Sequence, residues 1–397
     1  NTAVLSAVTT DKVAALTNEQ LGALSSSQVQ ALTTAQLTAL TAGQTAGLSA
    51  TQVAALNTDD VTGLNTDVLH ALTGTQVKGL ATSVIALMTT TQVAAFNGDQ
   101  VSQLTDGQVK ALSTTAVTAL NTEQASALTS AQIGALSTSQ VQALSSSSLN
   151  VLTSTNLRSL STTQIQALSS SVVSNLNTTQ LSSFSSTQSK ALTTQAVAGL
   201  QTTQVNALTT GSVSVLSANQ IRAMSTEQIA AVTTAGVAVF NSTQVGALST
   251  DQVAGMTTSQ VAALTTSEAA AMSAAQVKAL TTTQLGSLNT ADVKALTLNS
   301  VKAMTAAQIT ALSTSQVNAL ETEDVAALSD AQISALTTDQ VKALTTTAIT
   351  ALTNDQVSKF STAQVQSLTS SNVGALNSDQ VAALTTDQVS ALSTSQV

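Results

Sequence analysis

The feature that most constrains this chain is an eight-residue repeat that runs along it without an insertion or a deletion. Every residue whose number is divisible by eight, from Val8 to Leu392, is Leu, Met, Phe or Val, which makes 49 positions in a single phase. A unit of eight residues cannot bury a core by itself. The chain must therefore stack successive repeats on one another to become stable.

Each repeat carries a signal for the start of a helix. With the apolar column numbered position 8, position 1 is Ser, Thr or Asn in 46 of the 49 repeats, the exceptions being Ala81, Gln201 and Glu321. Position 4 is Gln or Glu in most repeats, and position 5 is Val, Ile or Leu in 45 of 49. Ser or Thr followed three residues later by Gln or Glu is a capping box, and the apolar residues at positions 8 and 5 match a hydrophobic staple.

The charged residues agree with this phase although they were not used to define it. Of the 20 Asp and Glu residues, 19 occupy positions 2 to 4, which is the first turn of each expected helix. Of the 11 Lys and Arg residues, nine occupy position 6, near the expected C-terminal end. This distribution complements the dipole of a short helix in every repeat.

The sequence therefore predicts an all-α fold: a solenoid of short helices, one per 8-residue repeat, stacked into an elongated rod. One long helix is disfavoured, because its apolar column would drift by about 80° per repeat. A β-solenoid and a disordered chain stay as alternatives. We expect residues 1–397 to form a single continuous solenoid of about 49 repeats, as a segment of a longer chain.

The number of repeats per coil is not readable from the sequence, because all repeats look equivalent. With about 10 Å between stacked helices, two repeats per coil would give a rod of roughly 250 Å and three would give about 160 Å.

The side chains that could carry chemistry are few. His70 is the only histidine, at the variable position 6, and we interpret it as an exposed substitution. The acid pairs Asp59–Asp60 and Glu323–Asp324 could do acid–base work or hold a cation, but both lie in a first helical turn, where they complement the helix dipole. We predict no catalytic, cofactor-binding or metal-binding residue. The five Met and four Phe residues all lie at position 8 and are expected to fill the core.

Composition narrows the class further. The net charge of −9 and the scarcity of aromatic residues argue against nucleic-acid binding. No apolar run is long enough to cross a membrane. The chain has no cysteine, which removes disulfides and thiol chemistry. Two glycosylation sequons, at Asn177 and Asn241, coincide with expected helix caps, and chance explains them in a chain rich in Ser and Thr.

The segment Leu336 to Leu352, LTTDQVKALTTTAITAL, resembles Ser/Thr-Gln-Val-Ala-Leu octapeptide arrays of very large bacterial secreted or surface proteins of the adhesin or exoprotein type. The resemblance extends over the whole chain. It implies a surface stalk, fibre or extracellular layer, and it carries over no functional residue.

These observations predict a non-enzymatic structural protein that forms an extracellular fibre, stalk or filament at the cell surface. Self-association into fibres or layers is expected, with surface glycans as further partners. The alternative is a binding surface for ice or glycans, presented by hydroxyl-rich rows of a rigid solenoid.

Overall fold

The computed structural model describes residues 2–397, and one short α-helix lies in each eight-residue repeat up to residue 392. The described residues contain no β-strand, so the all-α prediction is confirmed and the β-solenoid alternative is wrong. The chain divides into an N-terminal half, residues 1–200, and a C-terminal half, residues 201–397, and each half is described by itself.

The N-terminal half contains α1 (Thr2–Ser6), α2 (Thr10–Ala14), α3 (Asn18–Gly22), α4 (Ser26–Gln30), α5 (Thr34–Thr38), α6 (Ala42–Gly47), α7 (Ala50–Ala54), α8 (Thr58–Thr62), α9 (Thr66–Ala71), α10 (Gly74–Gly79), α11 (Thr82–Leu87), α12 (Thr90–Ala94), α13 (Gly98–Gln103), α14 (Asp106–Ala111), α15 (Thr114–Thr118), α16 (Thr122–Ala127), α17 (Ser130–Ala135), α18 (Thr138–Ala143), α19 (Ser146–Asn150), α20 (Ser154–Arg158), α21 (Thr162–Ala167), α22 (Ser170–Asn175), α23 (Thr178–Ser182), α24 (Ser186–Ala191) and α25 (Thr194–Ala198).

The C-terminal half contains α26 (Thr202–Asn206), α27 (Thr210–Val213), α28 (Ala218–Ala223), α29 (Thr226–Ala231), α30 (Thr234–Val237), α31 (Ser242–Ala247), α32 (Thr250–Gly255), α33 (Thr258–Ala262), α34 (Thr266–Ala271), α35 (Ala274–Ala279), α36 (Thr282–Ser287), α37 (Thr290–Ala295), α38 (Leu298–Ala303), α39 (Ala306–Ala311), α40 (Thr314–Ala319), α41 (Thr322–Ala326), α42 (Asp330–Ala335), α43 (Thr338–Lys342), α44 (Thr346–Ala351), α45 (Asn354–Ser358), α46 (Thr362–Ser367), α47 (Ser370–Gly374), α48 (Ser378–Ala382) and α49 (Thr386–Ser390).

The helices begin where the capping box places them. In α14 the Thr105 hydroxyl accepts the backbone N–H of Gln108 at 3.2 Å, and Gln108 Oε1 accepts the backbone N–H of Thr105 at 2.7 Å. In both halves, the majority of position-1 residues form the same reciprocal pair with position 4. Ser217 and Gln220 at the start of α28 are an example. In each helix that carries this pair, two of the orphan N–H groups are satisfied.

The turn between helices is made by two consecutive extended residues. Leu104 has φ −57° and ψ 138°, and Thr105 has φ −71° and ψ 158°. Among residues 2–397 none has a positive φ, so the turn needs no glycine. This explains why the glycines of the chain follow no repeat period.

The core is a continuous seam of residues from positions 5 and 8. In the repeat 137–144, for example, Val141 is 0% and Leu144 is 3% exposed. The five Met and four Phe residues at position 8 are each at most 5% exposed, so the prediction that they fill the core is confirmed.

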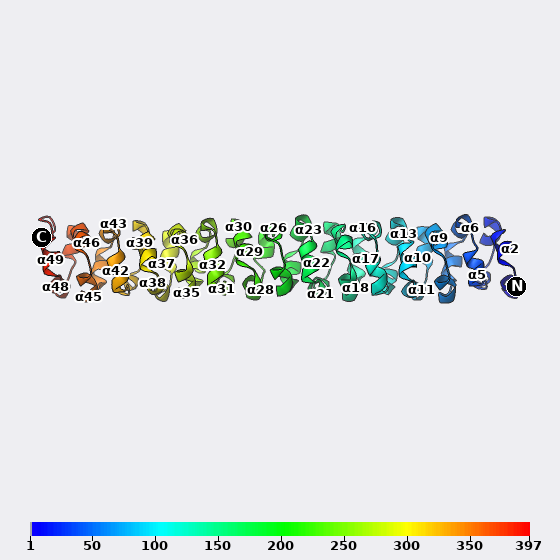
Figure 1. The fold of residues 1–397 in the computed structure, drawn as a ribbon, viewed down its shortest axis with the longest axis horizontal. Coiled ribbons are helices and arrows are strands. Elements are labelled where there is room, and N and C mark those ends of the chain that lie inside the picture. The colour runs from blue at the N-terminus through cyan, green and yellow to red at the C-terminus, as the bar shows by residue number, and fades with distance from the viewer. Residues whose placement is uncertain (1) are drawn as a thin grey trace. The chain divides into compact units, whose positions relative to one another are not determined.

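Within each half, every helix packs against the third helix before it and the third after it, such as α7, α10 and α13 in the N-terminal half and α32, α35 and α38 in the C-terminal half. Side-chain hydrogen bonds also reach the fourth repeat back, as described below. The number of repeats in one turn of each half therefore lies between three and four, and the alternative of two per coil is wrong. Within each half the helices follow one another in chain order (Figure 1).

Replacement of Leu288, which is 3% exposed, by Ala should open a cavity in the seam and cost about 2–5 kcal/mol of local stability. Amide hydrogen exchange of residues 281–288 measures this loss. Leu298, which lies at position 2 and is 38% exposed, is the matched control: Leu298→Ala should change stability by less than about 0.5 kcal/mol. Equal losses in the two variants would contradict the assignment of position 8 to the core.

Candidate functional site

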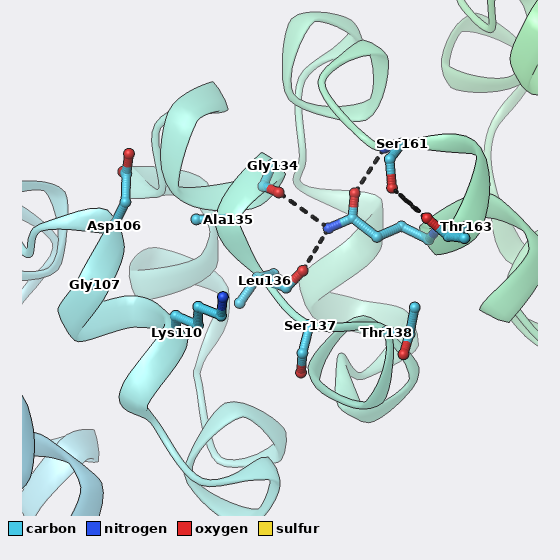
Figure 2. A pocket seen from close by; sticks show the side chains of 11 residues that line it. Asp106, Gly107, Lys110, Gly134, Ala135, Leu136, Ser137, Thr138, Ser161 and Thr163 are labelled. Carbon is cyan, nitrogen blue, oxygen red and sulfur yellow. Dashed lines mark hydrogen bonds between the residues drawn. The ribbon is translucent and has the colours of Figure 1, made fainter.

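The most distinctive polar group of the fold is the buried amide at position 4. Gln164 of α21 is 3% exposed, and its Oε1 accepts the backbone N–H of Ser161 at 2.7 Å. Its Nε2 lies 3.3 Å from the carbonyl oxygens of Ile133 and Gly134 and 2.7 Å from that of Leu136. Figure 2 shows the carbonyls of Gly134 and Leu136 converging on this one amide nitrogen.

The same arrangement recurs at regular sequence distances in both halves. Each such glutamine donates to the carbonyls of positions 5 and 8 of the fourth repeat back, and many also donate to that of position 6; we call this set of bonds the glutamine latch. In the N-terminal half, Gln100 donates to Leu69, His70 and Leu72 at 2.9, 3.2 and 2.6 Å. In the C-terminal half, Gln340 donates to Ile309, Thr310 and Leu312 at 2.8, 3.2 and 2.6 Å.

The latch solves a problem that a very short helix creates. A helix of five or six residues leaves most of its carbonyls without a partner inside the helix. The carbonyls of positions 6 and 8 lie at this C-terminal end and just beyond it. The position-5 carbonyl also accepts the backbone N–H of position 8, as Ile133 does from Leu136 at 3.3 Å. One glutamine side chain therefore completes the N-terminus of its own helix through Oε1 and the C-terminus of another helix through Nε2.

Shorter polar residues at position 4 keep only part of the latch. Asn372 Nδ2 donates to the carbonyl of Leu344 at 2.9 Å. Ser300 Oγ donates to that of Met272 at 3.3 Å. Both acceptors are the position-8 residue of the fourth repeat back, the carbonyl to which a shorter side chain still reaches.

Acidic residues at position 4 occupy the same buried place but cannot donate when charged. They are Asp60, Glu268, Asp292 and Asp324, each at most 5% exposed. Burial away from water is the largest cause that raises the pKa of each of these four carboxyl groups. In contrast, hydrogen bonds from its own backbone N–H and from the Ser225 hydroxyl lower the pKa of the exposed Glu227.

The two acid pairs singled out in the sequence are split by the fold. Asp59 and Glu323 at position 3 are exposed, whereas Asp60 and Asp324 at position 4 are buried. Both pairs lie in the first turn of their helices, as expected for complementation of the helix dipole. Their separation in exposure was not predicted from the sequence.

The remaining singled-out residues make local structural contacts. His70 is exposed, and its Nδ1 lies 3.0 Å from the carbonyl oxygen of Ala95. The side chains of Asn177 and Asn241 cap α23 and α31 by accepting the backbone N–H groups of Gln180 and Gln244 at 2.9 and 3.0 Å. The structure thus confirms the expected cap role of both asparagines.

Two surface grooves lie at equivalent places, one in each half. Each is bounded by position 8 of one repeat, by positions 1 and 2 of the next repeat, and by the N-terminal residues of the third repeat after that one. The groove of the N-terminal half also includes Gly107 and Gly134, whose missing side chains widen it, and Asp106 and Lys110 flank it (Figure 2). Exposed hydroxyl groups, such as those of Thr138 and Thr163, line this groove.

Sequence reasoning found the capping half of the glutamine role and missed the latch half. The signal that could have revealed it is the preference for Gln over Glu at position 4. A capping box accepts either residue, but only Gln also carries two donors.

Fold and latch together define a tandem-repeat protein of the α-solenoid class. The segments that match the model of the ALTTAQ repeat are residues 13–50, 106–138, 197–234, 234–266, 287–322, 317–354 and 354–386. They cover more than half of the chain, which therefore belongs to the ALTTAQ repeat family. No curated protein matches the chain.

Two further features concern the part of the chain that the structure describes. Residues 2–397 include no helix with the length and apolar character needed to span a bilayer. In the same range, no group of three or more His, Asp or Glu side chains is arranged to hold a metal ion.

Substitution of Gln164 by Glu tests the latch. At neutral pH the carboxylate keeps the capping acceptor but loses the donors to Ile133, Gly134 and Leu136, and we expect a local loss of about 1–3 kcal/mol. Amide hydrogen exchange in α17 and α21 measures it.

The matched control is Gln166→Glu, which makes the same chemical change at an exposed position of the same helix. It should alter stability by less than about 0.5 kcal/mol. If both variants lost the same protection, the effect would come from charge alone and the latch would have no part in it.

Proposed function

We propose that this chain is a non-enzymatic structural protein that forms an extracellular fibre, stalk or filament at the cell surface. The observation that carries the proposal is the equivalence of the repeats: the same cap, seam and latch recur in both halves. Such an array adds length without adding a specialised site, which is what a spacer or fibre requires.

The exterior supports the same proposal. Positions 1, 2, 3 and 6 are mostly exposed and rich in Ser and Thr, while charged residues are few. A surface of this kind stays hydrated without a strong field that would attract a particular charged partner. The resemblance to octapeptide arrays of bacterial adhesins and exoproteins favours placement outside the cell.

Two measurements test this function. Electron microscopy of the purified chain should show narrow particles or filaments of uniform width, and compact globules would contradict the proposal. Immunogold labelling of intact cells of the source organism should place the chain at the surface, and labelling that requires permeabilised cells would contradict the location.

A second candidate function is favoured by the two equivalent grooves. Because they present hydroxyl groups at the same place in separate parts of the array, they could serve as a repeated binding surface for glycans, or the exposed hydroxyl rows could contact ice. The grooves give the glycan version a defined place at which it can be blocked.

Gly107→Gln tests the glycan version, because a Cβ at Gly107 meets nothing closer than Thr82 Cγ2 at 3.8 Å and the new side chain can extend into the groove. If the groove binds glycans, retention on a glycan array should fall in this variant. Gly246→Gln, at an exposed position outside the grooves, should leave retention unchanged. Absence of glycan retention by the unmodified chain would end this candidate.

A further inference from the structure

Helix α37 has no glutamine at its own position 4, and the residue that would donate to its carbonyls is not glutamine either. At its own position 4 it carries Asp292, which is 1% exposed. By the spacing of the other latches, the position-4 residue four repeats later in the chain would donate to the carbonyls of Val293, Lys294 and Leu296. That residue is Asp324 of α41, which is 3% exposed.

Asp292 is incompletely paired. Its Oδ1 accepts a hydrogen bond from the Thr266 hydroxyl at 3.2 Å, while its Oδ2 is buried and has no hydrogen-bond partner. The same spacing places the carbonyl of Leu264 opposite this side chain. A charged carboxylate can only accept, so it cannot satisfy a carbonyl, and a buried acceptor without a donor is costly.

Other repeats of the same half show what a donor at position 4 does. Asn372, the amide counterpart of an aspartate, donates to the position-8 carbonyl of the fourth repeat back at 2.9 Å, and Ser300 does so at 3.3 Å. A protonated aspartic acid has the same length as asparagine and carries one O–H donor. It can therefore make the bond that the charged form cannot.

We propose that α37 is a proton-sensitive opening point of the solenoid. On acidification, Asp292 and Asp324 take up protons and donate to the carbonyls of Leu264 and Leu296, which closes both latches. When these protons are lost, α37 opens more often than the helices held by glutamine. The inference concerns the repeat lattice itself and does not depend on where the chain functions.

The charged surroundings of α37 are asymmetric. Of the helices that pack on it, α34 contributes Glu268, which adds a repulsive charge near Asp292, whereas α40 carries no titratable side chain. In the fourth repeats on either side, α33 has no titratable group and the α41 repeat has Glu321, Glu323 and Asp324. Of the helices that pack on α41, α38 carries Lys302, which is exposed, and α44 carries no titratable side chain. Lys294 of α37 pairs with Glu321 at 3.2 Å, but both side chains are more than half exposed and hold the repeats together weakly.

The direction of the pH effect follows from the raised pKa of both aspartates. Because the folded state binds the proton more tightly than the open state, the stabilisation is full below the ordinary pKa of 3.8 and is lost as the pH rises through the raised value. Inside that window, each carboxyl changes the opening equilibrium of α37 by about tenfold per pH unit.

The test is amide hydrogen exchange of residues 290–295 in the full chain from about pH 3, below the ordinary pKa of both aspartates, to about pH 8, corrected for the intrinsic pH dependence of exchange. Protection of α37 should increase on acidification. In the double variant Asp292→Asn/Asp324→Asn, protection should be high throughout and independent of pH, because an amide donates in either case.

The matched control is Asp251→Asn/Asp339→Asn, which removes the same number of charges from exposed position-3 residues of the same half. It should keep the pH dependence of the unmodified chain. Protection of α37 that does not change with pH in the unmodified chain overturns the proposal, and so does an equal response in the two double variants.

A final arm compares sodium, potassium and calcium chloride at constant ionic strength and neutral pH. No dependence on the cation is expected. If one cation restored protection and the asparagine variant abolished that response, the buried carboxylates would bind that cation and the proton mechanism would be wrong.

Discussion

The fold depends on the side-chain amide of glutamine, whose oxygen accepts one hydrogen bond while its nitrogen donates others. A helix of five or six residues cannot satisfy its own backbone, because the first four N–H groups and the last four carbonyls have no partner within it. Gln164 meets one need at each end, accepting from Ser161 and donating to Leu136. Its partners are 3 and 28 residues away in sequence, so one side chain joins local to long-range order.

The apolar seam works with the latch rather than replacing it. Positions 5 and 8 flank the region where the amide reaches its acceptors, so the hydrogen bonds are kept away from water by residues such as Val141 and Leu144. A hydrogen bond in such a place is strong, and a missing partner is correspondingly costly. The regularity of position 8 and the preference for Gln at position 4 therefore have one common cause.

Most of the local structure could be predicted from the sequence because its determinants lie within one repeat. The apolar column at position 8 defined the phase, the capping-box pattern and the charge distribution agreed with it, and the structure confirms the helix starts, as at Thr105 and Gln108. The coil geometry could not be predicted, because equivalent repeats give no clue to which one lies against which. The burial of Asp60 and Asp324 was missed for the same reason: burial at position 4 depends on how separate repeats pack together.

The latch contacts also explain why the residues that replace glutamine at position 4 are not equivalent to one another. Serine and asparagine keep one donor, as Ser300 and Asn372 show, and alanine or valine removes the donor without adding a charge. Aspartate and glutamate add a charged acceptor at a place where a donor to carbonyls is needed. At neutral pH they therefore destabilise the contact that serine and asparagine stabilise. A single such residue can be held by neighbours on both sides. In the proposed mechanism Asp292 and Asp324 act on the same helix, so α37 depends on two titrating carboxyl groups where a single substitution would leave it held on one side by glutamine.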